Sequence, residues 1–194
     1  MLFSHPRLAI LGTGRYAPEK IILNSHFEGR DLYNYDGLGN RVGEEVRLTD
    51  EKILKQTGIR ERRESGKDEW PSDMAYYAAV RALESAGIKA EELTGIILAT
   101  VTELANFASG AQKLQEWLNA TNVKLTYDFQ DACAGFPEAL MQADSRALRL
   151  PGYYLAGASE TLTKIVQHDD VNSDLFSDLA GFVVLGPATT GRGV

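Results

Sequence analysis

The stretch Asp131-Ala-Cys-Ala-Gly-Phe136 joins two different sequence patterns and holds the only cysteine of the chain. Before it, residues 123–129 alternate apolar and polar side chains, which predicts a strand; after it, an Ala/Leu-rich pattern to about Leu148 predicts a helix. At such a junction Cys133 stands at a helix N-terminus, where free backbone N–H groups and the helix dipole favour a thiolate over a thiol. The stretch therefore indicates an α/β fold with a reactive cysteine, while a small buried core cysteine fits the position equally well.

The composition is that of a folded domain with one sizeable core. The chain has 194 residues, of which 44% are hydrophobic and 24% charged. Its net charge of −7 argues against nucleic acid or an anionic membrane as partner. One cysteine excludes an internal disulfide framework, and the three dispersed histidines, His5, His26 and His168, lack metal-ligand spacing. We therefore expect a cytoplasmic protein without metal or cofactor.

Two further segments bear on organisation. The apolar run Leu8 to Leu11 ends in Gly12-Thr-Gly14, which predicts a strand followed by a turn. A dinucleotide-binding loop is disfavoured there, because Ala17 replaces the third glycine that such a loop requires. Residues 29–43 show no periodicity and predict a surface loop. The N-terminus has no basic segment before a long apolar run, and no run reaches about 18 apolar residues, so neither signal peptide nor membrane span is expected.

Strand and helix patterns alternate along the rest of the chain. Helices are predicted from Thr49 or Asp50 to Gly58, from the N-cap Ser72 to Gly87, and over 111–119; strands over 95–101, 123–129, 153–158 and 180–185. The run 95–101 is apolar on both faces, which is typical of a central strand. The run 123–129 is half polar and is expected at an edge. The alternation predicts an α/β domain with a mostly parallel sheet.

A basic cluster of Arg60, Arg62 and Arg63 leaves two interpretations open. It is either a docking patch for an acidic partner protein or a charged strand neutralised by Glu61 and Glu64. The second is preferred, because surface ion pairs of this kind are common and individually weak.

Taken together, these segments resemble the N-terminal half of the β-ketoacyl-acyl-carrier-protein synthase III family, condensing enzymes of the thiolase fold. The resemblance is carried, in the family's order, by Ile10-Leu-Gly-Thr-Gly14, Thr57-Gly-Ile-Arg-Glu-Arg62, Ala86-Gly-Ile88, Asp131-Ala-Cys-Ala-Gly-Phe136 and Ala180-Gly181 before Val183-Val-Leu185. It implies that residues 1–194 form an N-terminal thiolase-like half domain, a mostly parallel mixed sheet flanked by helices, with a surface excursion near 29–48. The C-terminal half is expected to be absent, because the chain stops directly after a strand-like run.

The resemblance assigns chemistry to Cys133. It implies that this thiol accepts an acyl group from acyl-CoA or acyl-acyl-carrier-protein, for decarboxylative condensation with a malonyl-type extender on acyl carrier protein in fatty acid or polyketide-type biosynthesis. The family's catalytic His and Asn lie in the C-terminal half, and His168 matches neither, so the chain alone is expected to be inactive. A homodimer through the strand before Cys133 is also implied. The alternative is a non-catalytic acyl-binding or dimerising subunit.

Several positions depart from the family's pattern on the coenzyme A side. Lys52 replaces a Trp that stacks on adenine, and Gln56 and Val171 each replace an Arg, which predicts weaker recognition of an adenine nucleotide. Leu179 stands where the family has a glycine, so the loop before it is expected to take a different path. Phe107 matches an aromatic residue near the family's acyl pocket, although ordinary core packing is the preferred interpretation.

Overall fold

The computed structural model describes residues 8–103 and 108–188, which divide into two compact units. The larger, here the sheet unit, comprises the chain up to Ala17, Glu69–Glu160, and the chain from Leu179. The smaller, here the small unit, comprises Pro18–Asp68 and Thr161–Asp178.

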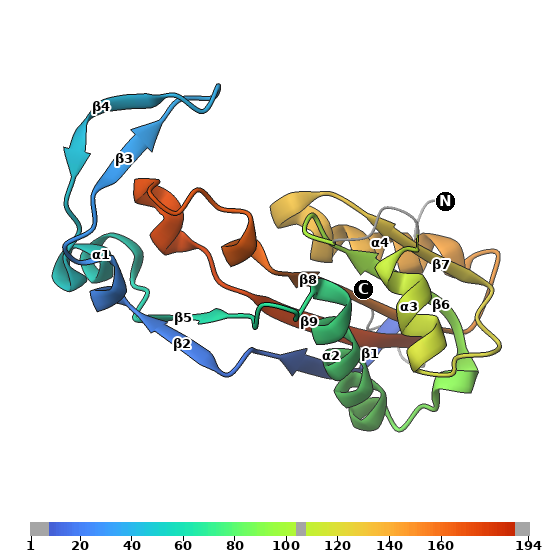
Figure 1. The fold of residues 1–194 in the computed structure, drawn as a ribbon. Helices are drawn as coiled ribbons and strands as arrows, with labels where there is room; N and C mark the ends of the chain where they lie inside the picture. The colour runs from blue at the N-terminus through green and yellow to red at the C-terminus, as the bar shows by residue number, and fades with distance from the viewer. Residues whose placement is uncertain (1–7, 104–107, 189–194) are drawn as a thin grey trace. The chain divides into compact units, whose positions relative to one another are not determined.

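The sheet unit is built on five strands in the order β1-β9-β8-β6-β7 (Figure 1). Their bounds are Leu8–Tyr16 (β1), Leu93–Ala99 (β6), Leu125–Phe129 (β7), Tyr153–Glu160 (β8) and Leu179–Pro187 (β9). Strand β6 runs parallel to both of its neighbours, whereas β9 runs antiparallel to both of its own. The predicted α/β class, the interior position of β6 and the edge position of β7 are confirmed, and the sheet is mixed.

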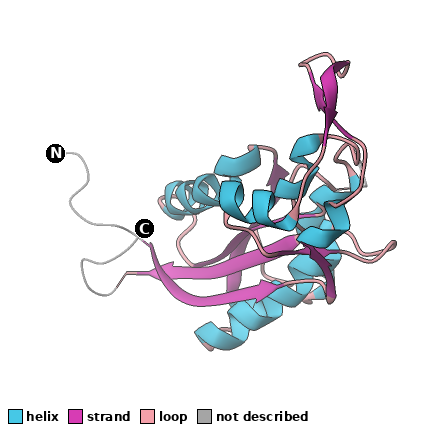
Figure 2. Ribbon diagram, turned by 90° about the vertical axis from the view of Figure 1, so that its left-hand side faces the viewer, coloured by secondary structure: helices cyan, strands magenta, loops and turns pink. Residues whose placement is uncertain are grey.

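Helices cover both faces of this sheet, as Figure 2 shows. Helices α2 (Pro71–Ala86) and α3 (Gly110–Trp117) share one core cluster with Ile96, Leu98 and Phe182. Helix α4 (Gly135–Ala147) lies on the other face, where its alanines pack with Ile97, Tyr154 and other side chains of the sheet. A single-turn 3-10 helix, η2 (Ala90–Glu92), leads into β6. Over the described ranges, none of the helices has the length and apolar character that crossing a bilayer requires.

The N-cap of helix α2 lies two residues before the predicted one. Its N-cap is Trp70, whose N–H donates to the Asp73 carboxylate at 2.8 Å, and Pro71 takes the first helical position. Proline suits that position because its missing N–H would have no helical partner. Ser72, the predicted cap, is instead a buried helical residue. The predicted end at Gly87 is confirmed by its left-handed φ of 66°.

Strand β1 runs unbroken to Tyr16, so the turn predicted at Gly12 and Gly14 is wrong. Both glycines lie inside the strand, where it crosses α2. A Cβ on Gly14 would stand 2.1 Å from the carbonyl oxygen of Ala78. The glycines are therefore required for close packing of β1 on the small-residue face of α2.

The small unit contains two short antiparallel pairs and one helix. Strand β2 (Lys20–Leu23) pairs with β5 (Glu61–Glu64), and β3 (Leu32–Tyr35) pairs with β4 (Arg41–Val46). Helix α1 (Asp50–Thr57) starts at Thr49, whose hydroxyl accepts from the Lys52 N–H, and ends at Gly58 with φ 73°, as predicted. Short 3-10 helices, η1 (Asn24–Phe27), η4 (Leu162–Lys164) and η5 (Val171–Leu175), complete it.

The β3–β4 hairpin occupies most of the segment predicted as a loop. Its turn is held by Asp36, whose side chain accepts from the N–H groups of Leu38 (2.8 Å) and Asn40 (2.9 Å). Strand β4 is exposed along nearly its whole length. A strand without a buried face has no apolar alternation, which explains why the pattern did not reveal it.

A network around Asp169 attaches this hairpin to the second segment of the small unit. The Asp169 carboxylate accepts from Gln167 (2.7 Å) and the Tyr35 hydroxyl (2.8 Å), and it pairs with Arg41 (2.5 Å). Its backbone carbonyl accepts from the Tyr33 N–H at 2.8 Å. The hydrogen bonds from Gln167 and Tyr35, with the Arg41 contact, lower the pKa of Asp169 from 3.8 to about 2.

This depressed pKa predicts an acid-sensitive hairpin. Because the carboxylate is favoured in the folded state, its contribution is present above the ordinary carboxyl pKa and is lost as the pH falls through about 2. We expect the difference in melting temperature between the wild type and Asp169→Asn to narrow as the pH falls from about 5 toward 2. Thermal unfolding of both proteins across that pH range measures this difference. A melting-temperature difference that does not change with pH would contradict a stabilising role of the Asp169 carboxylate.

Asp178, in the loop before β9, is fully buried and well paired. Its carboxylate accepts from the Ser65 N–H (2.8 Å) and hydroxyl (2.7 Å), and from the Thr163 N–H (2.9 Å) and hydroxyl (2.6 Å). Leu179 then opens β9 without a positive φ; in the described ranges, Asn119 and Ala132 alone among non-glycine residues have one. That the loop takes a path different from the family's stays a prediction.

Candidate active site

Cys133 lies where the parallel strands of the sheet unit end. Strand β7 stops at Phe129, the chain makes one 3-10 turn, η3 (Ala132–Ala134), and α4 begins at Gly135. The Ala134 N–H donates to the Asp131 carbonyl at 3.0 Å and closes that turn. The cysteine is exposed and forms no disulfide. The structure therefore supports the exposed thiol at a helix start rather than the buried core cysteine.

The turn that presents this thiol is strained. Ala132 has φ 40°, in the left-handed region that costs an ordinary L-residue about 1–2 kcal/mol. Gly135 is buried, and a Cβ there would lie 2.7 Å from the Ala99 Cβ on β6. The start of α4 is thus seated directly on the end of β6. This contact fixes the turn between a strand end and a helix start.

The loop after β6 is held by a half-buried carboxylate of β8. Glu160 accepts from the Val101 N–H at 2.8 Å and from the hydroxyls of Thr100 (3.4 Å) and Thr102 (2.5 Å). Burial raises the pKa of Glu160, and the bonds from Thr102 and Val101 oppose that shift in part. The loop is therefore fastened at residues 100–102, next to the strand end that precedes Cys133: the Thr100 N–H donates to the Phe129 carbonyl at 3.1 Å.

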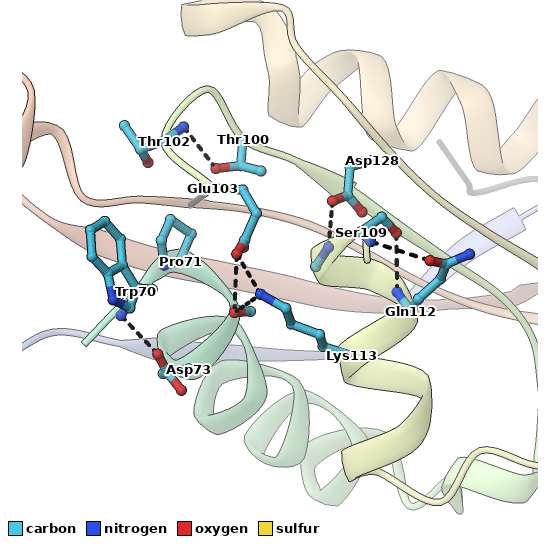
Figure 3. Close-up of polar contacts among 12 residues, drawn as sticks. Trp70, Pro71, Asp73, Thr100, Thr102, Glu103, Ser109, Gln112, Lys113 and Asp128 are labelled. Atoms are coloured by element: carbon cyan, nitrogen blue, oxygen red, sulfur yellow. Dashed lines mark hydrogen bonds and ion pairs between the residues drawn. The ribbon is translucent and has the colours of Figure 1, made fainter. Parts of the chain in front are cut away.

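A second carboxylate fastens the same region from β7. Asp128 accepts from the N–H groups of Gly110 (2.6 Å) and Ala111 (2.8 Å) at the start of α3 (Figure 3). Burial raises its pKa, opposed by those two N–H groups. A carboxylate is well placed at a helix N-terminus, because it satisfies unpaired N–H groups and opposes the dipole. Asp128 thereby connects α3 to the strand that leads to Cys133.

Glu103 completes the polar cluster drawn in Figure 3. Its carboxylate pairs with Lys113 of α3 at 2.7 Å and accepts from the buried Ser72 hydroxyl at 3.5 Å. Glu160 thus fastens the loop after β6, and Asp128 and Glu103 hold α3, at the carboxyl ends of the parallel strands. That edge is where ligands commonly bind in sheets with parallel strands.

Three of the other predicted site residues belong to the small unit. Lys52 and Gln56 are exposed, one turn apart on α1 of the small unit. Val171 is half-buried and packs on the apolar cluster of Phe27, Leu32, Leu48 and Ile53. Phe107 falls outside the described residues. The roles given to Cys133, Lys52, Gln56, Val171 and Phe107 stay predictions.

Two arginines of the basic cluster, Arg62 and Arg63, face opposite sides of β5. Arg63 pairs with Glu61 at 3.1 Å on the exposed side, and Glu64 pairs with Lys20, which fits the preferred interpretation. Arg62 faces the opposite way and is 2% exposed, so it belongs to neither interpretation. His168 is an exposed loop residue whose carbonyl accepts from Arg30.

The comparisons with known proteins give one consistent answer. No protein-family model matches the chain. The β-ketoacyl-[acyl-carrier-protein] synthase III of Geobacillus kaustophilus is 40% identical over 190 residues, which cover 95% of this chain and 55% of that protein. The corresponding protein of Laribacter hongkongensis is 39% identical and covers 93% of this chain and 52% of its own length. The chain spans about half the length of these relatives.

Solved structures agree with the sequence relatives. The 3-oxoacyl-[acyl-carrier-protein] synthase III of Aquifex aeolicus superposes with a TM-score of 0.79 at 33% identity, over 94% of this chain and 55% of that one. The priming β-ketosynthase of the R1128 polyketide pathway gives 0.80 at 28% identity, over 98% and 53%. In sequence and in fold, the chain is therefore similar over nearly its whole length to about half of these β-ketoacyl-[acyl-carrier-protein] synthase III proteins, the family that its motifs indicated.

Proposed function

We propose that this chain is the thiol-bearing half of an acyl-thioester condensing enzyme, with Cys133 as the acyl acceptor. The observation that carries the proposal is the exposed thiol on a strained turn at the start of α4. Catalytic nucleophiles are commonly presented on such strand-to-helix turns. The relatives named above are synthases that use an acyl carrier protein by name, which supports an acyl thioester as substrate class.

The proposed chemistry has two steps. The Cys133 thiolate attacks the carbonyl carbon of the donor thioester; the bond from that carbon to the donor's sulfur breaks, and the donor leaves as a thiol after taking up a proton. A malonyl-type extender then loses carbon dioxide, and the carbanion so formed attacks the acyl carbon on Cys133. A carbon–carbon bond forms and the Cys133 thiolate is released. Thioester exchange is nearly balanced in energy, so it divides the condensation into accessible steps.

The donor side is proposed to differ from a small acyl-CoA. Lys52 and Gln56 offer an exposed ammonium and an amide on α1, and Val171 contributes to an apolar cluster. None of the three supplies the aromatic plane or guanidinium fork suited to an adenine nucleotide. An acyl group carried on acyl carrier protein is the donor that fits these residues better. A reducing cytoplasmic location goes with the proposal, because it keeps a catalytic thiol free.

A homodimer through β7 belongs to the same proposal. In the sheet of the described residues β7 pairs with β6 and ends the strand order. Its residues are half-buried rather than charged and exposed, and an unprotected edge of this kind is a liability in a monomer. Pairing with β7 of a second copy would cover it. This edge equally supports the alternative, a non-catalytic dimerising subunit.

Product formation distinguishes a condensing enzyme from a non-catalytic dimerising subunit. We expect the full-length protein that contains this chain to convert an acyl thioester and malonyl-acyl carrier protein into a 3-oxoacyl product, detected by mass spectrometry. The 194-residue chain alone is expected to give none, because it spans about half of its relatives. A full-length protein that binds acyl donors but releases no product would favour the non-catalytic subunit.

A further inference from the structure

Arg62 of the small unit is a buried cation with an unused donor. Its side chain is 2% exposed; Nε donates to the Asp174 carbonyl and Nη1 to the Asn24 side chain. Nη2 has no hydrogen-bond partner, and the nearest carboxylate oxygen, on Asp174, is 4.0 Å away. A buried donor of a charged group that is left without an acceptor destabilises the fold. Arg62 Nη2 therefore needs a hydrogen-bond acceptor.

A second unused polar group lies on the same cavity. The Ser173 hydroxyl is buried and has no partner. Arg62 and Ser173 line a cavity of about 50 Å³, together with Phe27, Arg30 and His168 among others. One water needs only about 10–15 Å³ of such volume, so the cavity admits a group of several oxygen atoms. His26, His168 and Phe176, on its lining, are exposed and leave a way in.

The charges around the cavity favour an anion. Two guanidinium groups, Arg62 and Arg30, line it. Among its lining residues, all within the described chain, Glu64 is the single carboxylate, and Lys20 already pairs with it at 2.5 Å. His26 accepts from Arg30 at 3.1 Å, and burial followed by the Arg30 charge lowers the pKa of His26, so the positive charge of the cavity comes from the two arginines. Asp174, whose carboxylate is 4.0 Å from Arg62 Nη2, does not line the cavity.

We propose that this cavity is a binding site for a small oxyanion, of the size and charge of phosphate, which accepts from Arg62 Nη2 and from the Ser173 hydroxyl. Both side chains are nine-tenths or more buried, and neither Arg62 Nη2 nor the Ser173 hydroxyl has a hydrogen-bond partner. The site lies wholly in the small unit, so it is independent of thiol chemistry at Cys133.

Calorimetric titration of the chain with inorganic phosphate, at ionic strength held constant with sodium chloride, tests the proposal. We expect a dissociation constant at or below about 1 mM. Ser173→Ala is the main variant, because its hydroxyl has no partner to lose and the fold does not depend on it. It should bind phosphate about five- to tenfold more weakly, with an unchanged free energy of unfolding. Removing Arg62 itself would strip Asn24 and Asp174 of a partner.

Two further variants are compared with the wild type in the same titration. Arg30→Gln, on the cavity lining, should also weaken phosphate binding, whereas Ser25→Ala, exposed and not lining the cavity, should match the wild type. Phenyl phosphate in place of inorganic phosphate assigns the oxyanion to an ester if it binds more tightly, and to the free ion otherwise. Absence of saturable binding up to about 10 mM phosphate, or equal affinity in wild type and Ser173→Ala, would overturn the site.

Discussion

Replacing Gly14 by alanine is expected to destabilise the chain strongly. A Cβ at Gly14 would stand 2.1 Å from the Ala78 carbonyl oxygen and 2.3 Å from the Ala82 nitrogen, both backbone atoms of α2. Neither can move aside as a flexible side chain would. The strand must lift off the helix, which opens a core where Ala78 and Ala82 are fully buried. We expect a loss of at least about 3 kcal/mol, the upper end for overpacking and a large share of an ordinary domain's stability.

Gly181→Ala is the matched control for that variant. Gly181 pairs with Arg15, the residue after Gly14, and lies in the neighbouring strand β9 of the same sheet. A Cβ there meets nothing within 4 Å. The alanine should change the free energy of unfolding by less than about 1 kcal/mol. Urea unfolding of both variants gives the comparison, and equal losses in the two would show that close contact with α2 is not what the glycine serves.

The same glycines mark a limit of sequence interpretation. Gly12 and Gly14 predicted a turn, because glycine is the usual residue of turns. Their actual role depends on α2, which begins over fifty residues later in the chain. The face of α2 that receives the strand is formed by small residues, among them Ala78 and Ala82. Which strand it receives is a tertiary fact that neither local pattern contains.

Sequence patterns predicted the structural features that depend on neighbouring residues. The caps of α1 at Thr49 and Gly58, the edge position of β7 and the helix after Cys133 follow from nearby residues, and each is confirmed. The β3–β4 hairpin was missed because β4 buries almost nothing. Exposed pairing of this kind depends on turn and side-chain hydrogen bonds instead of apolar alternation.

In the candidate site, the sequence predicted Cys133 but did not reveal the carboxylates that fasten the neighbouring segments. Cys133 was placed at a helix start from sequence, while the choice between exposed and buried needed the structure. Asp128 alternates with the apolar residues of its strand, which is equally typical of a solvated side chain and of one that caps a helix. Glu160 and Arg62 likewise carry charge on strands, and only their partners from distant segments explain their burial.

Replacing Cys133 by alanine is expected to abolish covalent acylation completely. Cys133 is the only thiol of the chain, and it is exposed on the turn between β7 and α4. Serine at the same position keeps the shape but supplies a far weaker nucleophile at neutral pH, so Cys133→Ser should also fail to accumulate an acyl group. Neither variant should lower stability, because the cysteine is not part of a core cluster. Urea unfolding of the two variants checks this.

Alkylation separates simple exposure from the proposed role. The wild-type chain should react with iodoacetamide once, because it has one exposed cysteine. A thiol that takes up iodoacetamide but accepts no acyl group from any thioester donor would be exposed without being a nucleophile in acyl transfer.

Acylation of Cys133 is measured by intact-mass analysis of the full-length protein after incubation with acyl-CoA or acyl-acyl carrier protein. We expect a gain of one acyl group, reversed by hydroxylamine, located by peptide mapping to the Asp131–Phe136 stretch and missing from Cys133→Ala. An unchanged mass with every donor, or an adduct that persists in Cys133→Ala, would contradict it.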